Sequence, residues 1–503
     1  MNLRSNGKWK RVAFYAAIFV GLMLFFVCAH PLYIFDSDDW KYIATSRLPI
    51  PVPFIEWNPI KVLPEVLMPF VAQMGVSIIR PFMGDYIASM AFVAALVLAL
   101  FIILYLVSLD HLLAHTLKIN AARYWLVLSF LLLHFLPFGV VDAKRRHMFY
   151  AHDVNCVVNY TIAGLLNAAA VVFVLSGSMS KWKWKKAPFL DGLLLLGVYL
   201  CINSNLYDNY LLPLVFGTEL FWRIIDNIKT GRNRKNVWLK ECIGQNTVGI
   251  CVILLWILSA LTELSGGRAY GNTAILLKDA ACQFAAAVIG LNKVWLAGGA
   301  FAIAAGILVY IHFCRKGFCE IEQTYIQQFR VCGLSLILSM IYIILLSAKV
   351  DASYCTRADV MFGWMFWYLL LAVLSLGYLL KRCPQANAFL PILLFMIMSV
   401  TVTDGAMYAD CNVSNLNAQT VKEIDEYIIW QVQQAEKDGD NTVQVKIPVT
   451  ESDDWPIAVK WGSDGIANAL YKHGLVKRKM KIKFVMDESV NQKFGLNEIG
   501  LEE

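Results

Sequence analysis

Three carboxylates lie within four residues of the segment Ile34-Phe-Asp-Ser-Asp-Asp-Trp40, directly after the first long apolar run. Asp36, Asp38 and Asp39 repel one another at this spacing, and apolar neighbours would raise their pKa values further. Such carboxylates can accept a proton from a hydroxyl as a general base, or they can coordinate a divalent cation such as Mg²⁺ or Mn²⁺. A simpler interpretation is that they cap a short loop helix. The acidic pair fits a base and a cation site equally well, so metal dependence stays open.

Few basic residues are expected on the extracytoplasmic side of the membrane, where the acidic segment is also expected to lie. Lys144-Arg-Arg-His147 falls in a loop where the positive-inside rule disfavours basic residues, which suggests an anionic ligand such as a lipid phosphate. Guanidinium groups bind phosphate in a forked geometry. The alternative for each arginine is a side chain that reaches the membrane surface or, for Arg357, a pair with Asp359. The candidate phosphate ligands are Arg145, Arg146, His147, Arg268 and Arg357.

Four further side chains are candidates for positioning a substrate. Trp40 and Trp57 can stack on sugar rings, although aromatic residues are also common at membrane interfaces. Asp153 lies in a polar outside segment. Asp208 lies just inside a short apolar run, where an ionisable residue suggests function.

The composition requires a membrane as solvent. Of 503 residues, 58% are hydrophobic and only 16% are charged, too few charges to cover a soluble protein of this length. The formal charge of +7 does not indicate nucleic-acid binding, because the segment after Asp404 is net acidic and no basic stripe with interleaved aromatics is present. The twelve cysteines include no Cys-x-x-Cys pair and no zinc spacing.

Long apolar runs predict about eleven transmembrane helices. The N-terminal basic residues and the absence of a convincing cleavage site favour an uncleaved first helix with the N-terminus in the cytoplasm. The basic segments 181–186, 223–240 and 315–316 then face the cytoplasm, as the positive-inside rule requires. The runs lie near 12–29, 84–108, 122–141, 156–177, 188–203, 207–222, 246–262, 292–312, 331–349, 360–380 and 386–403.

Two segments outside the predicted spans favour helices on the membrane surface. The first outside loop, 30–85, is rich in proline and cannot be one long helix, but its second half, 62–82, is apolar. The segment 274–291 is amphipathic.

The last hundred residues differ in composition and predict a small α/β domain outside the cytoplasm. Helical spacing over 416–435, an alternating strand over 443–447, a helix over 464–473 and a strand over 481–485 follow one another. We therefore divide the chain into a membrane domain, 1–403, and an extracytoplasmic domain, 404–503.

The layout resembles the GT-C superfamily of membrane glycosyltransferases. An acidic pair in the first outside loop, in Asp38-Asp-Trp-x-Tyr42, followed by a proline-rich loop with Trp57-Asn-Pro59, is most similar to bacterial members that modify surface polysaccharides, including serotype-converting glucosyltransferases. Many members have Asp-Glu where this chain has Asp-Asp, so the resemblance does not decide which aspartate acts.

This resemblance implies an inverting transfer at the outer face of the plasma (inner) membrane. The donor would be a sugar on a polyprenyl phosphate, and the acceptor a glycan or glycolipid. Asp38 or Asp39 would be the base, with Asp36 a weaker candidate, and the basic residues would hold the lipid phosphate. Two alternatives remain open: a polysaccharide polymerase or ligase, which would use the outside arginines, and a transporter of lipid-linked glycans, which Asp208 would favour.

Overall fold

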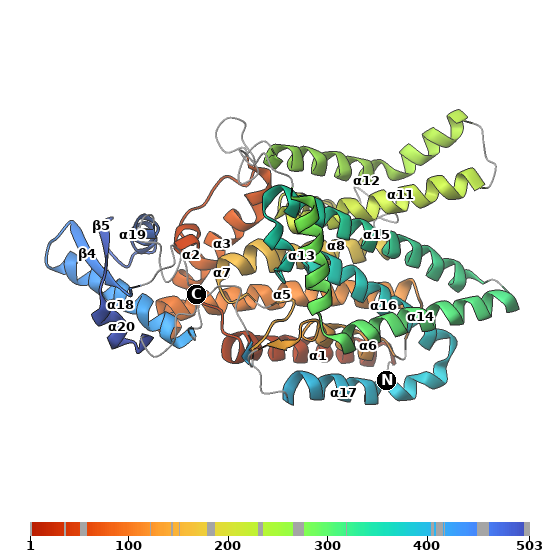
Figure 1. Cartoon of the computed structure of the whole chain (residues 1–503), viewed down its shortest axis with the longest axis horizontal. Helices are drawn as coiled ribbons and strands as arrows, with labels where there is room; N and C mark the ends of the chain where they lie inside the picture. Colours follow the sequence, from red (N-terminus) through yellow and green to blue (C-terminus); the bar gives the residue numbers. More distant parts are fainter. Residues whose placement is uncertain are drawn as a thin grey trace.

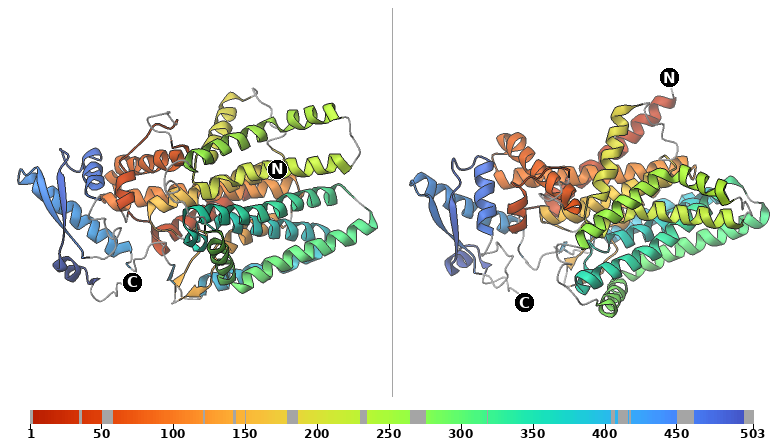
Figure 2. Two further views of the ribbon diagram at one scale, coloured as in Figure 1. Left: turned by 45° about the horizontal axis from the view of Figure 1, so that its top comes forward. Right: turned by 90° about the horizontal axis from the view of Figure 1, so that it is seen from above.

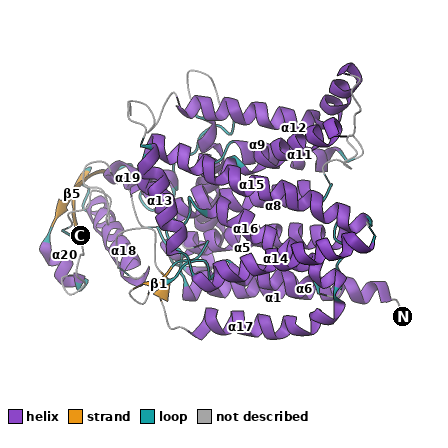
Figure 3. Cartoon of the chain, turned by 45° about the vertical axis from the view of Figure 1, so that its right-hand side comes forward, coloured by secondary structure: helices purple, strands orange, loops and turns teal. Residues whose placement is uncertain are grey.

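The computed structural model describes residues 3–34, 37–50, 58–120, 122–141, 144–149, 151–178, 187–229, 235–264, 276–317, 319–403, 407–408, 416, 418–449 and 462–496. Most helices run along the long axis of the molecule, and the last segment of the chain lies at one end of this bundle (Figure 1). Strands are confined to that segment and to a small patch near β1 (Figure 3).

The first half of the bundle contains the acidic segment and its neighbours. Its helices are α1 Leu3–Leu24, α2 Ser37–Tyr42, α3 Val62–Met74, α4 Arg80–Met83, α5 Tyr86–His115, α6 Arg123–Leu133, α7 Val154–Cys156, α8 Ala163–Leu175, α9 Pro188–Ile202, α10 Leu206–Asn209 and α11 Leu211–Lys229. Tighter or wider turns extend several of them: π-helical η1 Phe25–Ala29, η3 Gly75–Ile79 and η4 Val157–Ile162, and 3₁₀-helical η2 Pro59–Lys61.

The second half completes the bundle and ends in the C-terminal segment, residues 418–496. Its helices are α12 Lys235–Leu264, α13 Leu277–Gly290, α14 Lys293–Lys316, α15 Glu320–Val350, α16 Phe362–Arg382, α17 Leu390–Thr403, α18 Ala418–Lys437, α19 Gly462–Lys472 and α20 Glu488–Lys493, with 3₁₀ turns η6 Ala352–Thr356 and η7 Pro384–Phe389. The strands are β1 Val140–Val141, β2 Lys144–Arg145, β3 Met407–Tyr408, β4 Thr442–Ile447 and β5 Lys481–Met486.

Within the described ranges, eight helices are long and apolar enough to cross a membrane, as expected of a multi-pass membrane protein. A ninth span results if α9 and the α10–α11 helix, bent by 118° at their junction, are counted together. The predicted count of eleven is therefore not found. The run 122–141 is helical only to Leu133, the run 386–403 forms a short apolar helix, and the runs 188–203 and 207–222 belong to the bent pair.

One long apolar helix was not predicted as a span. The stretch Pro59–Met83 passes the length and composition test, because Pro64 and Pro69 are accommodated within a helix that continues through η3 and α4. The second segment that was predicted as a surface helix, 274–291, contains the helix α13, which lies across the bundle rather than along it (Figures 1 and 2).

Helices at the rim of the bundle expose apolar side chains that a soluble protein would bury. The apolar stretch of α16 is 89% buried, whereas that of α14 is 11% buried and exposes Val294, Phe301 and Leu308. Exposed apolar side chains on a spanning helix suit contact with lipid, so α16 forms part of the centre and α14 part of the surface.

Small residues bring α14 close to α16. A methyl group added at Gly306 would lie 2.7 Å from Cβ of Ser375, and one at Gly299 would meet the ring of Tyr368. Without a hydrophobic driving force between helices in lipid, such close approach supplies the packing energy. The Tyr325 hydroxyl shares a 3.0 Å hydrogen bond with Ser375 at this contact.

At the end of the bundle opposite the C-terminal segment, two buried carboxylates pair with partly exposed arginines. Glu322 is fully buried and accepts hydrogen bonds from Arg382 Nε at 2.6 Å and from the Tyr378 hydroxyl at 2.8 Å. Asp110, also buried, pairs with Arg11 at 3.0 Å and Arg123 at 2.6 Å. Each buried charge is thus compensated, as a low-dielectric setting requires.

The secondary structure predicted for the end of the chain is present. The helices α18 and α19 and the parallel strands β4 and β5 match the expected segments within a few residues. β4 alternates between exposed and buried side chains, and β4 and β5 pair in register from Thr442 with Lys481 to Ile447 with Met486.

Candidate functional site

A pocket of about 300 Å³ opens at the end of the bundle next to α2. Its walls come from segments far apart in the sequence, and it is lined by Asp38, Tyr42, Asn58, Ile60, Lys61, Asn155, Asn159, Tyr160, Asn205, Leu206, Tyr207, Glu263, Leu346, Val350 and Tyr354. Convergent polar groups over apolar walls are typical of a small-molecule site.

The helix α2 brings the acidic pair to this pocket, and its two aspartates have different environments. Asp38 is half-buried and lines the pocket, whereas Asp39 is fully buried. One Asp39 carboxylate oxygen accepts the backbone N–H of Asn155 at 2.7 Å. Asp38 is therefore the carboxylate that a ligand can reach, and Asp39 ties α2 to the opposite wall.

That wall is built from α7 and η4. Asp153 caps α7 by accepting the N–H of Cys156 at 2.6 Å, so this predicted positioning residue holds the wall rather than the ligand. The Asn159 amide donates to the side-chain oxygen of Asn155 at 2.7 Å and to its carbonyl at 3.0 Å. The π-helical turn η4 widens the helix at this point, and such turns recur at functional sites.

A third wall lies at the bend between α9 and α10. Asn205 and Tyr207 line the pocket, and the Asn205 side chain caps α10 by accepting the N–H of Tyr207 at 2.9 Å. Asp208 follows directly but is fully buried and does not line the pocket. Neither of its carboxyl oxygens has a hydrogen-bond partner within the described part of the chain.

Arg357 lies behind this pocket rather than in it. It forms a two-pronged ion pair with buried Asp359, with Nε 3.0 Å from Oδ1. Its guanidinium stacks on the rings of Tyr160 and Tyr354, 4.9 and 5.2 Å from their centroids. Both rings line the pocket, so the cation adds positive potential through them.

Lys61 brings a cation to the pocket lining, and the sequence analysis did not identify it. Lys61 lines the pocket, and its Nζ lies 5.6 Å from the ring of Tyr42; Lys41 Nζ lies 4.8 Å from the same ring. Glu263 at the end of α12 also lines the pocket. The available signal was the position of Lys61 two residues after Asn58-Pro59, at the start of the predicted surface helix.

Among the described residues, Trp40, Arg146 and His147 do not line this pocket. Trp40 is fully buried on α2 but is absent from the lining. Arg146 is exposed, and His147 packs among aromatic rings, 4.7 Å from the ring of His30. The backbone of Arg145 is part of β2, and its side chain lies outside the described structure, as do Asp36, Trp57 and Arg268.

A metal site can be looked for only among the residues that the structure describes. Among them, no group of three or more His, Cys, Asp or Glu side chains has a geometry that could hold a metal ion. Asp36, the third member of the acidic segment, lies outside this comparison.

Comparisons with known proteins add no family to this geometry. No family model matches the chain, and no curated protein or solved structure is significantly similar to it. The function therefore has to be argued from the pocket.

Proposed function

We propose that this chain is a GT-C-type glycosyltransferase that transfers a sugar from a polyprenyl-phosphate donor to a cell-surface glycan or glycolipid. The observation that carries the proposal is the pocket itself, which is lined by Asp38, Lys61 and several asparagines at one end of an apolar bundle. A lipid-linked donor needs such a place, with its tail in the membrane and its sugar among polar groups.

In the proposed reaction, Asp38 acts as the general base. Its carboxylate takes the proton of the acceptor hydroxyl, the hydroxyl oxygen bonds to the anomeric carbon, and the bond from that carbon to the phosphate oxygen breaks. The electron pair leaves with the phosphate, and attack from the opposite face inverts the anomeric centre. Asp39 does not contact the substrate; through Asn155 it holds Asp38 in position.

Negative charge on the departing phosphate requires a cation. Lys61 is the group best placed for this role, with Arg357 contributing through the rings of Tyr160 and Tyr354. The pairing of Arg357 with Asp359 reduces its net charge, which favours Lys61 as the direct ligand.

The proposed orientation puts the N-terminus in the cytoplasm and the pocket and the C-terminal segment outside, in the plasma (inner) membrane. Arg11, Arg123 and Arg382 support it, because they gather at the end of the bundle opposite the pocket. Basic residues near span ends favour the cytoplasmic side.

The test is Asp38→Asn in the full-length protein in lipid vesicles, with exposed Asp438→Asn as the matched control. The assay measures release of polyprenyl phosphate from a panel of polyprenyl-phosphate sugars in the presence of glycan acceptors. We expect Asp38→Asn to lower turnover by roughly 10²-fold or more, the range of a lost general base, with the control unchanged. Full turnover in Asp38→Asn would refute the assignment. A wild-type protein inactive on every donor would favour a polymerase, ligase or transporter.

A further inference from the structure

The C-terminal segment packs directly on the helix that carries the acidic pair. We infer that it is the positioning element of α2, and that Trp40, Gly465 and Lys472 hold Asp38 at the pocket. This inference rests on the proposed function, which gives Asp38 its importance. The contacts that position α2 do not depend on that function.

The closest contact is between backbones. A methyl group added at Gly465 on α19 would lie 3.1 Å from the backbone nitrogen and 3.3 Å from Cα of Lys41. Real Cβ atoms are rarely this close to backbone, and neither chain can move aside as a flexible side chain would. Glycine at this position therefore sets the distance between α19 and α2.

Trp40 is also part of this interface. Its side chain is fully buried and lies against the Asp425 carboxyl of α18. Asp425 is 2% exposed. Burial raises the pKa of Asp425 well above its usual range, although the contact with the Trp40 indole opposes the shift. Trp40 was expected to stack on a sugar; its burial makes it the link between α2 and the C-terminal segment.

Polar contacts fix the same segment to the chain on either side of α2. Lys472 Nζ donates to the carbonyl of Ala44 at 2.9 Å, just after α2 ends. At the start of α5, Asp85 forms an ion pair with Lys422, and the Tyr86 hydroxyl lies 2.7 Å from Nδ1 of His473. The C-terminal segment thus bridges α2 and the bundle.

A six-residue helix has little stability of its own, because helix nucleation is costly and only a few hydrogen bonds repay it. Within the bundle, the bond from Asn155 to Asp39 holds α2 from one side. The contacts with α18 and α19 hold it from the other. Loosening them would let Asp38 move relative to Lys61 and Asn155.

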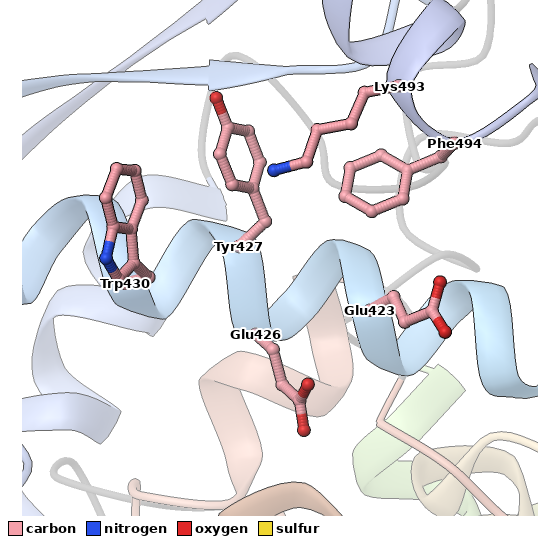
Figure 4. Close-up of a pocket in the computed structure, with 6 residues that line it drawn as sticks. All are labelled: Glu423, Glu426, Tyr427, Trp430, Lys493 and Phe494. Carbon is pink, nitrogen blue, oxygen red and sulfur yellow. The ribbon is translucent and has the colours of Figure 1, made fainter.

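The opposite face of α18 offers a matched control. There Lys493 Nζ lies 3.5 Å above the ring of Tyr427 and 5.2 Å from that of Phe494, and Trp430 is 53% exposed (Figure 4). Tyr427 and Trp430 lie on α18, and Lys493 and Phe494 lie at the end of α20. None of these four residues contributes to the contacts with α2 described above.

The experiment is hydrogen exchange of the α2 amides in full-length protein in lipid nanodiscs. Gly465→Leu is the main variant, Lys472→Met a milder one, and Trp430→Ala the control. We expect exchange at residues 37–42 to rise more than 10-fold in Gly465→Leu, and about fivefold in Lys472→Met, which loses one hydrogen bond. Trp430→Ala should leave it unchanged.

Unchanged protection of α2 in both Gly465→Leu and Lys472→Met would overturn the inference. If Gly465→Leu does not fold, Lys472→Met decides alone. Release of polyprenyl phosphate, measured on the same samples, separates the two proposals. Faster exchange of the α2 amides together with full turnover would support the positioning contact but would show that Asp38 takes no part in the reaction.

Discussion

His473 makes the docking of the C-terminal segment sensitive to acid. The imidazole is 8% exposed and lies at the contact between α19 and α5, where its Nδ1 is 2.7 Å from the Tyr86 hydroxyl. Burial lowers the pKa of His473 to about 4, with smaller contributions from the charges of Lys472 and Arg80, while a hydrogen bond to the Ile43 carbonyl opposes the shift.

The direction of the pH effect follows from proton binding. A histidine exposed by undocking binds its proton near pH 6.5, so between about 4 and 6.5 the undocked state binds more protons than the docked one. The stabilisation is fully present above about 6.5 and is lost as the pH falls toward 4. The shift corresponds to about 3 kcal/mol in total and to about 2 kcal/mol between pH 7 and pH 5.

The assay is hydrogen exchange of α19 amides at pH 7 and pH 5, corrected for the intrinsic exchange rate. We expect local opening to be about 20-fold more populated at pH 5 in the wild type, and to change much less in His473→Gln. The glutamine oxygen can still accept a hydrogen bond from Tyr86 but does not titrate in this range. An equal pH effect in both proteins would refute the assignment to His473.

Two further predictions concern the bundle, and thermal-shift measurements in detergent check both. Gly164→Ala should destabilise the protein by about 1–3 kcal/mol, because the new methyl group would lie 2.6 Å from the Phe362 ring, whereas Gly197→Ala meets open space and should not; equal effects would contradict the packing. Glu322→Ala should cost about 1–3 kcal/mol, because the half-buried Arg382 loses its partner and the buried Tyr378 hydroxyl loses its acceptor. Glu320→Ala, which breaks an exposed pair, should cost under about 1 kcal/mol, and a similar loss in both would refute the argument.

The sequence predicted the features that depend on local pattern. Helical and alternating periodicity located α18, β4, α19 and β5, because each buries one face against the others. Apolar length located most of the long helices, but it overcounted where a run ends its helix early, as at Leu133, or bends sharply, as between Ile202 and Leu206. These breaks depend on tertiary packing that hydropathy does not encode.

The candidate site was predicted only in part. The acidic segment pointed to Asp38, which lines the pocket from the first turn of the short helix α2. The cation that accompanies it was missed, because the place of Lys61 next to Asn58-Pro59 gives only proximity along the chain, whereas its place in the pocket lining depends on the fold of the segment Pro59–Lys61. Trp40 was expected to stack on a sugar but is buried against Asp425 of α18. The sequence shows which residues are adjacent along the chain, but not which distant residue a side chain contacts.

The pocket is assembled from residues as far apart as Asp38 and Tyr354. During synthesis, therefore, a nascent chain that ends before Tyr354 lacks part of the pocket. The helix α2 gains its contacts with the C-terminal segment only when α19 has been made. A ligand that binds only the complete pocket would stabilise the finished molecule over every partly assembled one, by mass action. The concentration of such a ligand would then influence how much of the protein reaches the fully folded state.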